Sequence, residues 1–211
     1  MVLSKKQLLG SLLLLSILYL LGCNNHKPNK TRKKSDYQEI KVTRVKFNYN
    51  QTFEIKEIKK GHSISDIFVS GIGFQNSSNT IKYADVYPFE DLIITDIDTD
   101  GFEELYIITR SAGSGSYAEL IGITSIKGKS YKTIYIPEYD NKLDTTYNYL
   151  NGYMGHDSIY VNNKQLCREF PIYKPTDYNA NPTGGKRKII YKLVEYNNSF
   201  SLQVDSVKML N

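Results

Sequence analysis

The chain has 211 residues, of which 12% are aromatic and 23% are charged, and its formal net charge is +5. The charge is unevenly distributed, because seven of the 27 Lys and Arg residues, but none of the 22 Asp and Glu residues, precede Asp36. The rest of the chain carries 20 basic and 22 acidic residues and is slightly acidic, which argues against a nucleic-acid-binding protein.

The first residues of the chain have the pattern of a signal peptide, two basic residues followed by an apolar segment. Lys5 and Lys6 precede an almost purely apolar stretch over residues 8–21, and Gly22 and Cys23 close it. A core of this length is typical of a removed signal peptide, whereas a spanning helix needs about 20 apolar residues. The small residue directly before Cys23 resembles the lipobox of bacterial lipoproteins, in which the cysteine takes a diacylglycerol and becomes the new N-terminus. The alternative is an ordinary buried cysteine at the end of a single anchor helix.

The sequence therefore predicts three parts. Residues 1–22 form a lipoprotein signal peptide, residues 23–40 comprise the lipidated Cys23 and a flexible basic tether, and residues 41–211 form a single domain. Acyl chains such as palmitate would anchor the protein to a membrane, and the basic tether would contact anionic lipid headgroups. Asn24 after the cysteine favours the outer membrane, with the domain in the cell envelope, either in the periplasm or at the surface.

The domain is predicted to be all-β, a mostly antiparallel β-sandwich with at most one or two short helices. It is rich in Tyr, Ile, Thr and Val, contains no Trp, and has no long stretch of helical periodicity. One short helix is placed within residues 139–156. Turn signals separate the strand candidates, which cover residues 41–47, 52–58, 65–70, 91–95, 104–109, 117–125, 131–136, 158–161, 165–173, 188–196 and 200–207.

Cys167 is the only cysteine besides Cys23, so the fold has no internal disulfide if Cys23 is lipidated. It lies in a predicted strand, and we expect a small buried apolar residue. A reactive thiol would need a neighbouring base that the sequence does not identify.

Acidic residues alternate with other residues between two predicted strands. Their carboxylates would converge if the loop turns sharply at Gly101, and such oxygens suit Ca²⁺. The helix-loop-helix type of calcium loop needs Glu at its twelfth position, where Ile107 stands. The spacing resembles instead the shorter loops of integrin-type propeller repeats. The alternative is a tight Asp-Gly turn with solvated acids. No cofactor is expected to be required, and the predicted ligands of a structural Ca²⁺ are Asp96, Asp98, Asp100, Phe102 and Glu104.

A second loop is rich in glycine and small hydroxyl residues and joins predicted strands 104–109 and 117–125. Two glycines let such a backbone form a thin, protruding finger. A G-x-S-x-G nucleophile elbow around Ser114 is disfavoured because Ala112 stands where the first Gly belongs. A phosphate-binding loop would continue as a helix, whereas a strand is predicted here. A flexible glycine turn is the alternative. The loop comprises Arg110, Ser111, Ala112, Gly113, Ser114, Gly115, Ser116 and Tyr117.

The run from Ser114 to Tyr117 resembles the Ser-Gly-x-Tyr motif of bacterial periplasmic and membrane-bound lysozyme inhibitors, and the longer run from Arg110 looks most like the inhibitors of invertebrate-type lysozyme. A second block is similar to that group as well. It consists of Gly155-His156-Asp157, Arg168 to Tyr173, Asp177, and residues 181–185.

The resemblance implies a β-sandwich that inserts this loop into the substrate cleft of a lysozyme. Ser114 and Tyr117 would hydrogen-bond the two catalytic carboxylates, and Arg110 would hold the loop base or meet a carboxylate itself. The expected protein is a lipid-anchored inhibitor without enzymatic activity of its own. Its partners would be a lysozyme and the membrane, with no nucleic acid. The sequence does not decide whether the chain forms a homodimer. The alternative is a Ca²⁺-stabilised envelope lipoprotein that binds glycan or another surface protein.

Two further features have plainer interpretations. His156-Asp157 is more typical of a turn hydrogen bond than of a catalytic base. Tyr147, Tyr149 and Tyr153 suit an aromatic sugar platform or, equally, the packed edges of strands.

Overall fold

The computed structural model of the protein describes residues 40–47, 50–137, 148–178 and 180–210. The chain divides into two units, Met1–Tyr37 and Gln38–Asn211, and all described residues belong to the second. The predicted signal peptide, Cys23, almost all of the tether, and residues 139–147 of the helix candidate lie outside the described residues. Within the described ranges, no helix is long and apolar enough to cross a membrane.

The domain is all-β, as predicted. Among the described residues there is no α-helix. In the described part of the helix candidate, residues 149–152 form a turn and Tyr153 forms an isolated β-bridge with Ile172. Eleven of the strands coincide with predicted segments, and β4 was missed. The strands are β1 (Ile40–Lys46), β2 (Thr52–Lys59), β3 (Ser65–Ile72), β4 (Ile81–Val86), β5 (Phe89–Thr95), β6 (Glu104–Arg110), β7 (Ala118–Ile126), β8 (Ser130–Tyr135), β9 (Ser158–Asn162), β10 (Gln165–Pro171), β11 (Lys186–Tyr196) and β12 (Ser199–Leu210).

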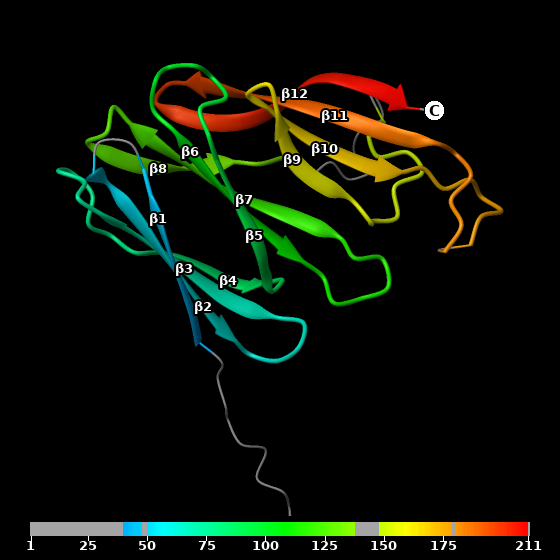
Figure 1. Cartoon of the computed structure of the whole chain (residues 1–211), viewed down its shortest axis with the longest axis horizontal. Coiled ribbons are helices and arrows are strands. Elements are labelled where there is room, and N and C mark those ends of the chain that lie inside the picture. Colours follow the sequence, from blue (N-terminus) through cyan, green and yellow to red (C-terminus); the bar gives the residue numbers. More distant parts are fainter. Residues whose placement is uncertain (1–39, 48–49, 138–147, 179, 211) are drawn as a thin grey trace, which may run out of the picture. The chain divides into compact units, whose positions relative to one another are not determined.

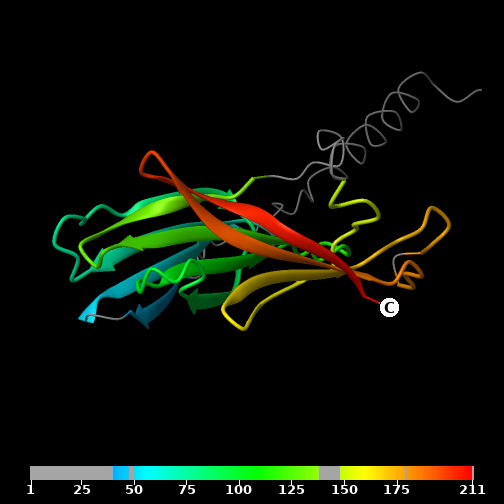
Figure 2. The ribbon, with the colours of Figure 1, turned by 90° about the horizontal axis from the view of Figure 1, so that it is seen from above.

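The strands form two sheets. The smaller is an antiparallel meander in the order β1-β2-β3-β4, and the larger has the order β5-β6-β7-β8-β12-β11-β10-β9. Within the larger sheet only β8 and β12 run parallel, and they pair through just two positions, Phe200 with Ile134 and Ser201 with Tyr135. This short seam joins two antiparallel halves, β5–β8 and β9–β12, which appear green and yellow to red in Figures 1 and 2.

The first core lies between the smaller sheet and one face of β6–β8. On β2 burial alternates, so Phe53 and Ile55 face inward while their neighbours are half-exposed. They pack with Leu105, Ile107 and residues of β1, β3, β7 and β8. Figure 1 shows the blue and cyan strands lying along the green ones.

The second core lies on the opposite face of β6–β8, against β10–β12. Tyr106 from β6 meets Leu166, Phe170 and Ile189 there, and each of these side chains has 0% exposure. The two edge strands of the larger sheet, β5 and β9, also approach each other. The sheet therefore curls around this core, so that β6 and β7 contribute apolar side chains to both cores.

Gly122 on β7 makes room at the centre of the second core. A Cβ at this position would lie 2.9 Å from the Cβ of Ile134 and 3.4 Å from the ring of Tyr106. We expect Gly122→Ala to push these side chains apart and lower the free energy of unfolding by about 1–3 kcal/mol. Urea denaturation of the purified chain measures this.

The control is Gly61→Ala, because nothing lies within 4 Å of a Cβ at Gly61. It should change the stability by less than about 0.5 kcal/mol. Equal effects of the two substitutions would contradict the proposed packing.

Candidate functional site

The glycine- and serine-rich loop at residues 110–117, here called the finger, joins β6 to β7. Its two ends are tied together, since the Ser111 amide donates to the Tyr117 carbonyl at 2.9 Å and the Tyr117 amide donates to Ser111 Oγ at 2.8 Å. A third bond, from the Ser116 amide to the Gly113 carbonyl at 3.0 Å, closes the tip. The finger is therefore a closed turn, with Ser114 exposed at its tip and Tyr117 39% exposed at its base.

Arg110 holds the base of the finger. Its guanidinium donates to the Ser116 carbonyl at 2.7 Å and to the Asp157 carbonyl at 3.0 Å, and its Nε pairs with Glu90 at 2.6 Å. Three of its nitrogens are thus bonded within the chain. Of the two roles predicted for Arg110, the structure supports holding the loop base.

The turn at residues 155–156 backs the finger. The His156 amide donates to the Gly115 carbonyl at 2.7 Å. Gly155 has a φ of +87°, and a Cβ there would come within 1.9 Å of the Gly115 oxygen. Only glycine permits both this backbone angle and this approach.

Asp157 is the centre of a buried ionic cluster behind the finger. Its side chain has 0% exposure, and its carboxylate accepts from the Ala118 amide at 3.0 Å and from Arg168 Nε at 2.6 Å. Arg168 also donates to the Ala118 carbonyl at 2.9 Å and to Tyr153 Oη at 2.7 Å. Asp157 is therefore a structural anchor rather than part of a simple turn.

The two motif blocks noted in the sequence are thus partly brought together. Gly155, His156, Asp157 and Arg168 surround the base of the finger. Asp177 lies in a separate loop between β10 and β11, where it accepts from Lys174 and Thr183 amides at 2.7 and 2.8 Å. These amide bonds lower the pKa of Asp177.

The tyrosines near the finger are packed. Tyr153 stacks edge-on against Tyr117 at 5.5 Å and against Phe170 at 4.8 Å, and the Arg168 guanidinium lies 5.0 Å from its ring centre. Burial raises the pKa of Tyr153. Tyr153 therefore fits the packing interpretation, Tyr149 is half-buried, and Tyr147 lies outside the described residues.

A groove of about 320 Å³ runs beside the base of the finger. Its walls combine aromatic, aliphatic and charged side chains, and it places a guanidinium and a carboxylate near Tyr117. The lining residues are Tyr87, Tyr117, Ala118, Glu119, Leu120, Ile136, Pro137, Tyr153 and Arg168.

The acidic residues predicted to bind Ca²⁺ form one cluster in the loop between β5 and β6. One carboxylate oxygen from each of Asp96, Asp98, Asp100 and Glu104 lies within 4.8 Å of the others. Gly101 has a φ of +89°, as the predicted sharp turn requires. Phe102, the fifth predicted ligand, has no carboxylate and would contribute its backbone carbonyl, which stays a prediction.

Glu104 differs from the exposed acids of this loop because it has 0% exposure. Its Oε2 accepts from the Ile97 amide at 2.9 Å, whereas Oε1 is buried without a hydrogen-bond partner. Burial and the negative charges of Asp98, Asp96 and Asp100 raise the pKa of Glu104 to about 9. The loop is therefore more than a turn with solvated acids.

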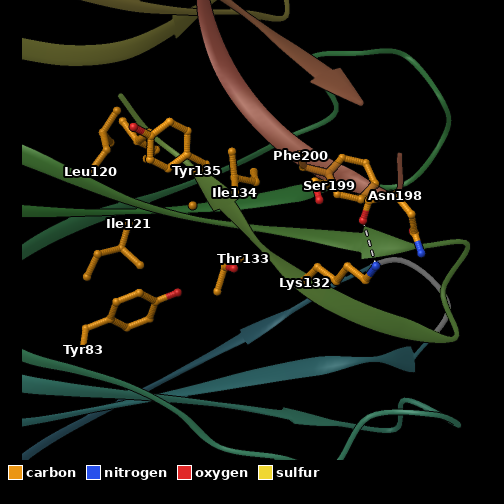
Figure 3. A pocket seen from close by; sticks show the side chains of 12 residues that line it. Tyr83, Leu120, Ile121, Lys132, Thr133, Ile134, Tyr135, Asn198, Ser199 and Phe200 are labelled. Carbon is orange, nitrogen blue, oxygen red and sulfur yellow. Dashed lines mark hydrogen bonds between the residues drawn. The ribbon is translucent and has the colours of Figure 1, made fainter. Parts of the chain in front are cut away.

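A second hollow, of about 600 Å³, follows the seam between β8 and β12. Figure 3 shows Tyr83 of the smaller sheet on one side of it and Phe200 of β12 on the other. Lys132 donates a hydrogen bond to the Asn198 carbonyl at 2.8 Å, at one edge of the hollow (Figure 3). The described residues that line it include no Asp, Glu, His or Cys, so it offers no carboxylate, imidazole or thiol group.

Cys167 on β10 is buried, with 0% exposure, as predicted.

Comparison with known proteins adds nothing to these observations, since no family model, no curated protein and no solved structure matches the chain.

We expect Gly155→Ala to separate the turn at 155–156 from the finger, because the new methyl group would overlap the Gly115 carbonyl. The bond from His156 to Gly115 should be lost, and the free energy of unfolding should fall by about 2 kcal/mol or more. Amide hydrogen exchange at His156 and thermal unfolding measure the two effects. Gly113→Ala is the matched control, since nothing lies within 4 Å of a Cβ there. Faster exchange at His156 in the control as well would refute the contact.

Asp157→Asn should destabilise the domain by about 3–5 kcal/mol, because it leaves the Arg168 guanidinium buried without its counter-ion. Denaturant unfolding is the measurement. Glu54→Gln is the comparison, since it removes one carboxylate from the exposed Arg44–Glu54 pair and should cost less than about 1 kcal/mol. A loss at Asp157 no larger than that at Glu54 would show that the cluster does not anchor the finger.

Proposed function

We propose that the protein is a membrane-anchored lipoprotein that inhibits lysozyme by inserting the finger into the enzyme's active-site cleft. The observation that carries this proposal is the contrast within the finger. Its tip, at Ala112, Gly113 and Ser114, is exposed, whereas its base is held by Arg110 and backed by the buried Asp157.

A pre-formed loop suits an inhibitor for an energetic reason. A loop that is already ordered loses little conformational entropy when it enters a cleft, so more of its contact energy appears as affinity. The backbone bonds within the finger and the His156 bond to Gly115 order it before any partner arrives.

The chemistry of the finger suits a glycosidase cleft. Such a cleft presents one protonated acid and one ionised carboxylate. A hydroxyl both donates and accepts hydrogen bonds, so the Ser114 and Tyr117 hydroxyls would match both groups. They offer the hydroxyl chemistry of a sugar without a glycosidic bond to cleave. The edge-on contact with Tyr153 would keep the Tyr117 ring in place.

The surroundings of the finger are compatible with a protein partner. The groove beside it would receive a side chain from the rim of the cleft, and Glu119 and Arg168 supply both signs of charge there. The slightly acidic domain favours a cationic partner. Lipidation at Cys23 would place the inhibitor beside the peptidoglycan that it protects.

Ser114→Ala and Tyr117→Phe should each weaken inhibition by about 10-fold or more, because a hydrogen bond to a charged group contributes about 1.5–3 kcal/mol. The assay measures hydrolysis of bacterial cell walls by invertebrate-, chicken- and goose-type lysozymes, titrated with the full chain in detergent and with matching detergent blanks.

Tyr196→Phe is the control, since Tyr196 lies outside the finger on β11 and is 76% exposed. It should inhibit like the unchanged protein. Full inhibition by both finger variants would refute the mechanism, and no inhibition of any lysozyme type would refute the function.

The second candidate function is an envelope lipoprotein that binds glycan or another surface protein. The aromatic and charged groove beside Tyr117 favours it. Binding of peptidoglycan fragments by a chain that inhibits none of the three lysozymes would support this alternative.

A further inference from the structure

The loop between β5 and β6 crowds four carboxyl groups into a small space. One oxygen from each of Asp96, Asp98, Asp100 and Glu104 lies within 4.8 Å of the other three. Like charges at this separation repel strongly, particularly where one of them is shielded from water. The described residues place no Lys or Arg in a salt bridge with any of the four.

Backbone amides occupy one oxygen of each carboxyl group. Glu104 Oε2 accepts from Ile97 at 2.9 Å and Asp96 Oδ2 from Gly101 at 3.2 Å. Asp98 and Asp100 likewise accept from the amides two residues further on, at 3.2 and 2.7 Å. These bonds fix the orientation of all four groups.

The remaining oxygens of Glu104 and Asp96 lack partners. Glu104 Oε1 and Asp96 Oδ1 are both buried, and no hydrogen-bond donor reaches either of them. The Glu104 side chain as a whole has 0% exposure, so water does not replace the missing donor. An unpaired buried oxygen is costly, and a cation bound between the carboxylates would remove the cost.

We propose that this loop binds one Ca²⁺ ion through Asp96, Asp98, Asp100 and Glu104. Ca²⁺ takes six to eight oxygen ligands in flexible geometry, and four carboxylates with the Phe102 carbonyl or water would supply them. Mg²⁺ keeps several waters and is held by one or two carboxylates, so a dense carboxylate cluster favours the larger ion. Zn²⁺ favours nitrogen and sulfur ligands, and the cluster contains neither His nor Cys.

The bound ion would stabilise the domain whichever partner the finger binds. It would join the end of β5 to the start of β6, at the end of β6 opposite the finger. It would also cover one end of the second core, because Tyr106 follows Glu104 on the same face of β6, two residues further along.

Ca²⁺ should raise the melting temperature of the full chain in detergent by about 5–10 °C relative to EDTA, at an ion concentration of about 100 Kd. Mg²⁺ at the same concentration should raise it much less. Equilibrium dialysis should find one Ca²⁺ per chain. The absence of both a thermal shift and a bound ion would overturn the proposal, while the lysozyme assay would still test the function separately.

Two variants locate the ion. Asp98→Asn, at an exposed position, should keep the EDTA melting temperature and lose most of the Ca²⁺-dependent rise. Glu104→Gln should also lose the rise, and in EDTA it should melt no lower than the unchanged chain, because glutamine has the same shape and adds no charge to the crowded cluster. Asp91→Asn on β5 is the matched control and should keep the full rise. If Glu104→Gln does not fold, the comparison of Asp98→Asn with Asp91→Asn decides whether the ion binds in this loop. A full rise in Asp98→Asn would overturn the assignment.

Discussion

The finger and its surroundings depend on the hydrogen bonds and the ion pair made by the buried carboxylate of Asp157. The carboxylate accepts a hydrogen bond from the amide of Ala118, the first residue of β7, and pairs with Arg168 of β10. The backbone carbonyl of Asp157 accepts a hydrogen bond from Arg110 at the end of β6. One residue thus joins three strands from both halves of the larger sheet. A buried charge is costly without partners, and removing any one partner leaves the others uncompensated. This mutual dependence keeps an irregular loop in a single arrangement.

Strand β6 organises the domain around this cluster. Glu104, Tyr106 and Arg110 alternate along one of its faces, with the acidic cluster at one end, the buried tyrosine ring in the middle and the base of the finger at the other end. Its other face, with Leu105 and Ile107, packs on the smaller sheet. The strand therefore contributes side chains to both cores, to the acidic cluster and to the base of the finger. These contacts explain why six of its seven residues are buried.

Local patterns in the sequence were sufficient to predict most strands, because alternation and turn residues act within a few positions. Strand β4 was not predicted because it is an edge strand. Three of its six residues are exposed, including Lys82 and Asp85, so its alternation of apolar and polar residues is weak. The acidic cluster was predictable because its members lie within nine residues of one another. The partnership of Asp157 with Arg168 and Ala118 was not, since it depends on which distant strands the fold brings together. The available signal was weak: Arg168 directly follows the apolar pair Leu166 and Cys167 in a predicted strand.

The seam between β8 and β12 has a consequence for how the domain forms. The two halves of the larger sheet share only two paired positions there, and β12 is the last strand of the chain. Apart from the pairing of β8 with β12, strands β1–β8 pair only with sequence neighbours, so they can assemble early through local contacts. The second core is enclosed only when residues 199–210 reach β8 across more than 60 intervening residues. Closing so large a loop is entropically costly and slow, so we expect the pairing of β8 with β12 to be a late step of folding. Until it occurs, an aromatic surface that includes Tyr106 remains accessible to chaperones and proteases.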